Sequence, residues 1–155
     1  INFKDTMNSF KYVLLSSFAF LLFSVSSQHL YAQADLPWET LLDAKFKYTY
    51  DVEQDIWYNK PQFNKKVQKM EGEEVIVQGF MVPVDVTGDT YVLSAFPYSA
   101  CFFCGAAGKE SVMEIRMKDN EQTFKMDQML TFKGKLDLVD DVYGLMYLLE
   151  EAEVQ

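Results

Sequence analysis

Five strand-like runs separated by turn residues, two of which (111–118 and 130–138) alternate apolar and polar residues, predict an all-β protein. Glycines stand within these runs at Gly79, Gly134 and Gly144, as strands that bend tightly around a small barrel require. The length of 155 residues suits one domain with one core. We therefore predict a small five-stranded antiparallel barrel of the oligonucleotide/oligosaccharide-binding (OB) type with a short N-terminal helical or irregular extension. An open antiparallel sandwich is the alternative.

The barrel core is expected over residues 73–155. Its strands are predicted within residues 75–82, 91–96, 111–118, 130–138 and 143–154. The fourth run is the most regular, because its apolar residues and one glycine occupy every second position. The glycine inside the first run indicates a bulge or a sharp bend.

The first 34 residues have the features of a cleaved secretory signal peptide. Lys4 and Lys11 flank the start of an apolar stretch at 12–25, and Ala32-Gln33-Ala34 supplies small residues at the cleavage spacing. The apolar stretch is shorter than the roughly 20 residues of a membrane-spanning helix. We therefore expect a periplasmic or secreted protein with no stable membrane span after cleavage.

The charge balance excludes several classes of function. The net charge of −9 makes nucleic-acid binding and adhesion to anionic membranes unfavourable, because both require a basic surface. The single histidine, His29, lies in the signal segment. The mature protein is therefore expected to lack a histidine-based triad, general base or zinc site.

The N-terminal extension is expected over residues 35–72. Residues 36–42 predict a helical turn with Pro37 near its start, residues 46–52 alternate as a strand does, and Asn64 is placed to cap a short helix that Gly72 ends. Two interpretations fit its many aromatic residues: a lid that packs on one end of the barrel, which we expect, or a platform for a ligand. These aromatics are Trp38, Phe46, Tyr48, Tyr50, Trp57, Tyr58 and Phe63.

The only two cysteines, Cys101 and Cys104, stand on a Gly/Ala-rich loop between two predicted strands. This spacing allows both sulfurs to bind one zinc or copper(I) ion. Without histidine, a further zinc ligand has to be a carboxylate such as Glu110 or Glu114. Copper(I) accepts softer ligands, including methionine.

Two other interpretations of the cysteine pair remain open. A static disulfide is natural in an exported protein and would shape the loop more than stabilise the domain. Catalytic dithiol–disulfide cycling is the second, although the surroundings predict strands rather than the helix N-terminus that lowers a thiol pKa in thioredoxin-like proteins.

Several segments together resemble a family of bacterial exported proteins of unknown function. The matching segments are 79–84, 91–97 and Ser99-Ala100-Cys101, with Trp38 and Leu41 upstream. Members of that family are secreted proteins or lipoproteins, and the resemblance, which covers about Trp38 to Val154, implies an OB-like barrel. It assigns no activity.

The chain departs from the motif of many family members after Cys101. Those members place histidine two residues after the cysteine and then a proline run, whereas this sequence has Phe103, Cys104 and the segment 105–108. Cys101 matches the motif, and Cys104 enters as a substitute ligand.

We expect a non-enzymatic exported binding or accessory module. Its partner is an envelope protein or a small ligand, and the ligands of its metal site are Cys101, Cys104 and Glu110 unless the cysteines form a structural disulfide. The alternative is a thiol-redox or metal-transfer protein that uses the same cysteines. A third possibility is oligosaccharide binding by Trp57, Tyr58 and Tyr98.

Overall fold

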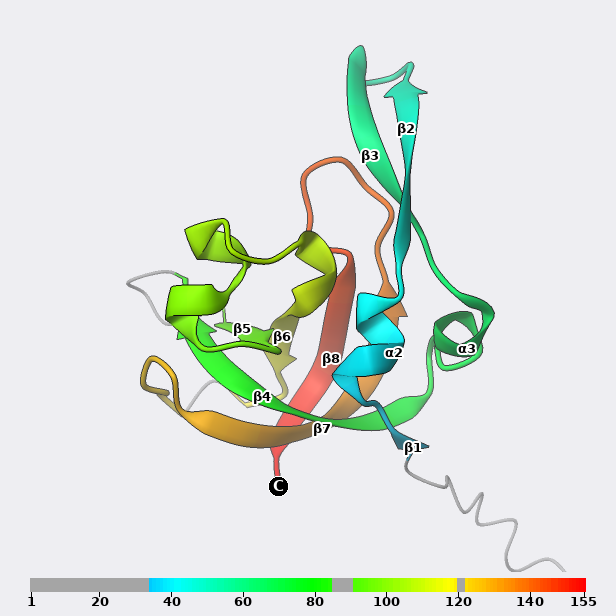
Figure 1. Ribbon diagram of the computed structural model, residues 1–155. Coiled ribbons are helices and arrows are strands. Elements are labelled where there is room, and N and C mark those ends of the chain that lie inside the picture. Colours follow the sequence, from blue (N-terminus) through cyan, green and yellow to red (C-terminus); the bar gives the residue numbers. More distant parts are fainter. Residues whose placement is uncertain (1–33, 85–90, 120–121) are drawn as a thin grey trace, which may run out of the picture. The chain divides into compact units, whose positions relative to one another are not determined.

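The computed structural model describes residues 34–84, 91–119 and 122–155 (Figure 1). The chain from Gln33 to Gln155 forms one compact unit that contains every described element. The predicted signal peptide lies outside the described residues except for Ala34. Among the described residues, no helix has the length and apolar character needed to span a membrane.

Five strands close into a barrel, which confirms the predicted fold class. They are β4 (Glu74–Pro83), β5 (Tyr91–Ser94), β6 (Val112–Met117), β7 (Met129–Leu138) and β8 (Tyr147–Val154). The sheet order is β4-β5-β6-β8-β7, and β7 pairs again with β4 to close the ring. The β6–β8 pair is parallel and the other pairs are antiparallel. This mixed pairing is compatible with the OB-like fold that we predicted, although alternation alone could not reveal the parallel pair.

Two of the three glycines act as expected. A Cβ atom at Gly79 in β4 would lie 2.7 Å from the Ser94 carbonyl oxygen, and one at Gly134 in β7 would lie 2.7 Å from that of Glu150. Both strands pair on two sides, so their neighbours approach too closely for a side chain. Gly144 was wrongly assigned to a strand. It precedes β8, and its N–H donates to Asp141 in the loop.

The barrel interior is filled by alternate residues of the five strands and sealed by the extension. Its largest fully buried side chains are Tyr147 and Phe132. Helix α2 (Trp38–Leu42) covers this core, and Pro37 is its N-cap residue, near the start of the helix as predicted. The Tyr147 hydroxyl donates to the Leu41 carbonyl oxygen at 2.8 Å, so that α2 is tied to the start of β8.

The rest of the extension is also short. Strand β1 (Ala34–Asp35) lies parallel to β4. Helix α3 (Lys65–Gln68) is capped by Asn64, whose side chain accepts from the N–H groups of Lys66 and Val67, and Gly72 has a φ of +76° in the turn before β4. The predicted N-cap is thus confirmed, whereas Gly72 does not end the helix, which stops at Gln68 with Lys69 as its C-cap.

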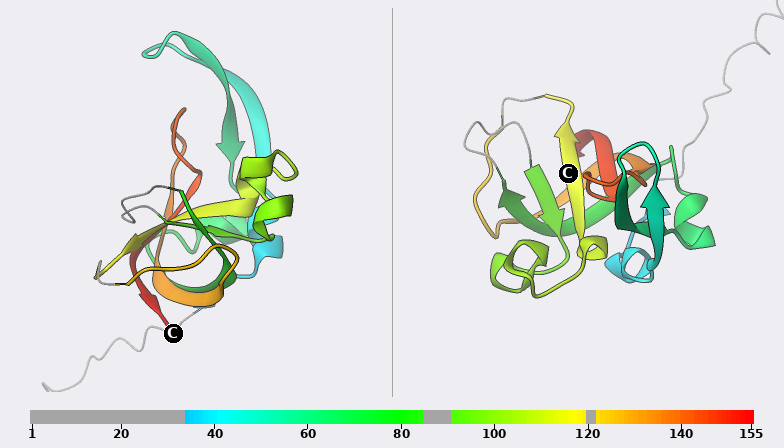
Figure 2. Two further views of the ribbon diagram at one scale, coloured as in Figure 1. Left: turned by 90° about the vertical axis from the view of Figure 1, so that its left-hand side faces the viewer. Right: turned by 90° about the horizontal axis from the view of Figure 1, so that it is seen from above.

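A two-stranded hairpin precedes α3. Strands β2 (Lys45–Asp51) and β3 (Ile56–Gln62) pair antiparallel along their whole length. Figure 1 and the left view of Figure 2 show the hairpin extending away from the barrel. The sequence predicted β2 but not β3, and the expectation that the aromatics of this region form a lid is wrong for those of the hairpin that are exposed.

Candidate functional site

The cysteine loop, residues 95–111, folds over the outside of the barrel. It contains three single 3₁₀ turns, η1 (Tyr98–Ala100), η2 (Phe102–Cys104) and η3 (Lys109–Ser111). Phe102 packs against a small apolar cluster on the outer face of β4, β5 and β6, formed by Val82, Val92 and Val112. The packing of Phe102 therefore fixes the loop to the outer surface of β4, β5 and β6.

The two cysteines are free, and they occupy different environments. Cys101 is buried and Cys104 is exposed. The backbone carbonyl of Cys101 accepts the N–H groups of Cys104 and Ala106, both at 3.3 Å. Cys101 is extended between two turns, whereas Cys104 precedes Gly105, which has a φ of +72°. The structural disulfide is therefore not formed in this structure, because one thiol faces the interior and the other faces solvent.

Glu110, the proposed third metal ligand, lies at the far end of the same loop. Its carboxylate folds back over Gly108, where it occupies the space that a Cβ would need. Its charge also reaches Tyr147, because it helps to raise the pKa of that phenol after the larger effect of burial. Within residues 34–84, 91–119 and 122–155, no three histidine, cysteine or acidic side chains gather as a metal site. The metal ligation by Cys101, Cys104 and Glu110 stays a prediction from spacing.

Four of the exposed aromatic side chains of the described residues lie on the hairpin. Alternation places Phe46, Tyr48 and Tyr50 of β2 on one face together with Trp57 of β3, and we call these four residues the aromatic face. Tyr48 is 66% exposed and Trp57 is 58% exposed. The Tyr48 and Trp57 rings stack with centroids 5.1 Å apart and planes at 16°, and Tyr50 tilts against Trp57 at 5.2 Å. The sequence signal was present in the period-2 aromatics of β2, but the strand that completes the surface was missed.

The opposite face of the hairpin anchors it to the β7–β8 loop. The Lys60 ammonium lies 2.7 Å from the Asp140 carboxylate, and the Tyr58 hydroxyl donates to the Asp140 carbonyl oxygen at 3.3 Å. The hydrogen bond that Lys60 donates to Asp140, followed by the negative charge of that carboxylate, raises the pKa of Lys60. Because these contacts use the other face of the ribbon, they hold the aromatic face away from the β7–β8 loop.

The three residues proposed for oligosaccharide binding are not brought onto one surface. Trp57 and Tyr58 are neighbours in β3 and so point to opposite faces of the hairpin. Tyr98 lies in η1 of the cysteine loop, where its N–H donates to Asp127. A single platform built from these three rings is therefore not supported.

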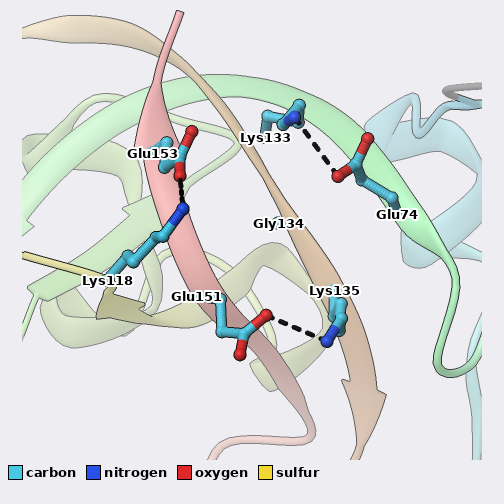
Figure 3. Close-up of a pocket in the computed structure, with 7 residues that line it drawn as sticks. All are labelled: Glu74, Lys118, Lys133, Gly134, Lys135, Glu151 and Glu153. Carbon is cyan, nitrogen blue, oxygen red and sulfur yellow. Dashed lines mark hydrogen bonds and ion pairs between the residues drawn. The ribbon is translucent and has the colours of Figure 1, made fainter.

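A polar depression on the outside of β7 and β8 is lined by paired charges (Figure 3). Lys133 lies 3.2 Å from Glu74, and Lys135 lies 2.9 Å from Glu151. Lys118 pairs with Glu153 and thereby lowers the pKa of that carboxyl. Since each lysine faces a glutamate across neighbouring strands, the arrangement fits cross-strand support better than anion binding.

An open groove of about 430 Å³ runs beside α2 and the middle of β4. Trp38 lines it, and its indole N–H donates to the Gln78 carbonyl oxygen at 2.7 Å. Leu36 and Ile76 add apolar surface, and Asp35 and Glu39 add acidic groups. The indole is thus held as part of the wall of the groove, next to the point where the described chain begins.

No protein-family model matches the sequence, and no curated protein or solved structure matches it. The five-stranded barrel is the part of the family resemblance that the structure supports. Any functional conclusion therefore has to come from the surfaces described above.

Proposed function

We propose that the protein is an exported, non-enzymatic binding module that holds a partner protein against the aromatic face of its hairpin. The exposure of that face carries the proposal. Its four rings present on the order of 400 Å² to solvent, an apolar patch of the size that often marks an interaction site. Tyrosine and tryptophan are also the residues enriched in protein interfaces.

The orientation of the rings favours a protein partner over a sugar. Sugar rings stack on flat aromatic faces that are open to solvent. In this hairpin the Tyr48 and Trp57 rings lie nearly parallel to each other at 5.1 Å, so each covers one face of the other. Tyr50 also tilts against Trp57, so the three rings form a cluster rather than one flat open surface. Such a cluster of aromatic rings with polar groups suits the mixed apolar and polar contacts of a protein surface.

The ionisable groups give no comparable support for catalysis. The pKa of Tyr147 is raised strongly, chiefly by burial, and such shifts often accompany active sites. This phenol, however, is fully buried and donates to the Leu41 carbonyl oxygen. Its place in the core is explained by the docking of α2, so it is not a candidate general acid or base.

Site-specific photocrosslinking in the exported protein tests the proposal. A photoreactive phenylalanine analogue at position 57 should give one discrete adduct, whereas the analogue at Tyr143, which is 77% exposed on the β7–β8 loop, should not. The partner identified from the adduct is then purified, and Tyr48→Ser should weaken its binding at least tenfold. Equal labelling from both positions, or unchanged binding by Tyr48→Ser, would contradict the proposal.

The free thiols support a second candidate, metal binding or thiol exchange at Cys101 and Cys104. Both sulfurs are unpaired and one is exposed, so a thiophilic ion has a point of attachment. The test is a copper(I) or zinc titration of anaerobically purified protein against a competing chelator. One tight equivalent that is lost in Cys101→Ser and Cys104→Ser and weakened in Glu110→Gln would establish the site. Equal affinity in all variants would refute it.

A further inference from the structure

The outer edge of β2 is an open pairing surface. Among the described residues β2 pairs with β3 alone. The contacts with Asp140 are made by Tyr58 and Lys60 of β3, so they leave the outer edge of β2 uncovered. Five of the seven residues of β2 are exposed and the other two are half-buried. An exposed strand edge of this length is a ready template for another strand.

The register with β3 shows which backbone groups face this edge. Phe46 lies opposite Pro61, and proline has no N–H to donate. That pair therefore cannot exchange both hydrogen bonds, so it is a non-hydrogen-bonded pair. In an antiparallel ladder hydrogen-bonded and non-hydrogen-bonded pairs alternate, so every second pair along β2 is of the same type. It follows that Phe46, Tyr48 and Tyr50 direct their N–H and C=O groups to the outer edge. No described backbone group outside the hairpin bonds to these three residues.

We propose that two copies of the chain pair along β2 in antiparallel fashion, with Tyr48 opposite Tyr48 of the second copy. This register is self-complementary over the full strand. Phe46 lies opposite Tyr50 of the second copy, so the outward backbone groups of all three aromatic residues meet their counterparts. Lys45 lies opposite Asp51 of the second copy, which adds an ion pair at each end of the pairing.

Neighbouring registers are worse. A shift of two residues in one direction places Lys47 opposite Lys47 of the second copy, and like charges directly opposite are unfavourable. A shift in the other direction leaves Lys45 and Phe46 without partners in the second β2. A shift by one residue faces outward backbone groups with inward ones. Charge and backbone pattern therefore select the same register.

The charge distribution of the whole chain agrees with this contact. The net charge is −9, but residues 45–62 contain three lysines and three acidic residues. Two acidic copies can therefore approach along the hairpin without net repulsion between the paired segments. Asp51 accepts the N–H groups of Glu53 and Gln54 through one oxygen, so its other oxygen is available to Lys45 of the second copy. Lys45 would exchange its exposed contact with Asp43 for this one.

The inference does not rest on the proposed function, because it uses the edge of β2 rather than the aromatic face. It does extend that face, since residues directly opposite each other in a sheet share one side. The dimer would present the aromatic residues of both copies on one four-stranded sheet. A contact of seven residues is small, so we expect dissociation in the micromolar range, on the order of that for other small interfaces.

Sedimentation equilibrium of the full chain and of residues 33–155, which contain the complete described core, is the first test. We expect a concentration-dependent dimer that Tyr48→Pro abolishes, because the lost N–H faces the second copy and not β3. Asn59→Pro is the matched control: Asn59 lies opposite Tyr48, so its lost N–H faces away from β2 and the dimer should persist. A monomer at all concentrations, or a dimer insensitive to Tyr48→Pro, would overturn the proposal.

Charge exchange and crosslinking test the register independently. Lys45→Glu and Asp51→Lys should each weaken self-association, and a mixture of the two variants should form the heterodimer. In a Cys101→Ser, Cys104→Ser background, Tyr48→Cys should form an intermolecular disulfide, because Cα atoms of a bonded pair lie about 5.5 Å apart. Tyr50→Cys should not, since Tyr50 faces Phe46. Equal crosslinking at both positions, or no heterodimer, would refute this register. A wild-type chain that stays monomeric but still gives the discrete adduct from position 57 would refute the dimer and leave the proposed function standing.

Discussion

Replacement of Tyr147 by phenylalanine measures how much the hydrogen bond between Tyr147 and α2 contributes to the stability of the barrel. The side chain is fully buried at the start of β8, its ring lies 5.9 Å from that of Phe63, and its hydroxyl donates to the Leu41 carbonyl oxygen at 2.8 Å. Phenylalanine keeps the ring and leaves no cavity larger than the missing oxygen. The variant therefore removes one buried hydrogen bond and little else.

The expected loss is about 1 kcal/mol in the free energy of unfolding. That is the usual net value of one hydrogen bond. A carbonyl left without any partner would raise the loss to about 1–3 kcal/mol, but the Leu41 oxygen also accepts the Ala44 N–H at 3.2 Å. Because that bond remains, the lower value applies.

Urea denaturation followed by circular dichroism, on residues 33–155, provides the measurement. The midpoint should fall while the slope with urea stays constant, since the same surface is exposed on unfolding. Tyr143→Phe, at an exposed position, is the control and should change stability by less than about 0.5 kcal/mol. A loss above about 2.5 kcal/mol, or none, would show that the hydroxyl is not bonded as described.

Comparison of wild type with Tyr147→Phe also gives a prediction for the stability at alkaline pH. Burial, with a smaller contribution from Glu110, raises the pKa of Tyr147 above its ordinary value of 10.0. The folded phenol then keeps its proton after the unfolded one has lost it, so the stability that Tyr147 contributes is complete below pH 10 and declines as the pH rises further. The advantage of wild type over Tyr147→Phe should shrink above that pH. An advantage that grows with pH would contradict the assigned cause.

Three further predictions concern other parts of the chain. Gly79→Ala should destabilise the barrel by about 1–3 kcal/mol, because the new Cβ would meet the Ser94 carbonyl oxygen. A thermal melt equal to that of wild type would show that β5 does not approach Gly79 this closely. A thiol reagent should label one cysteine per native chain and two in denaturant, with native labelling lost in Cys104→Ser; rapid native labelling of Cys101 would contradict its burial. Lys60→Met should leave the thermal melt of the whole domain nearly unchanged, because the ion pair with Asp140 is exposed to solvent. The substitution should nevertheless speed amide hydrogen exchange in the hairpin, and unchanged exchange would show that this pair does not anchor it.

The regular alternation of the chain made the barrel predictable. In β6 and β7 mainly one face is buried, so their apolar residues recur at every second position and identify both the strands and the core, whereas β5 is buried on both faces and does not alternate. The sequence marked Gly79 as a special position in a curved strand, but the register of β4 runs through it without a bulge, and only the structure shows that Ser94 and Leu93 leave no room for a side chain there. The caps of α2 and α3 were likewise local signals, which a short segment contains completely.

The sequence by itself thus determined the five barrel strands, the acidic charge and the position of the cysteine loop. Tertiary structure alone decided that the Cys101 thiol is buried while that of Cys104 is exposed, because burial depends on what lies across the loop and not on spacing. It also decided that Tyr48 and Trp57 stack on an exposed hairpin. An aromatic side chain is stabilised by burial either in the core of its own domain or in an interface with a partner. Only the arrangement of the whole chain shows whether the domain itself buries it.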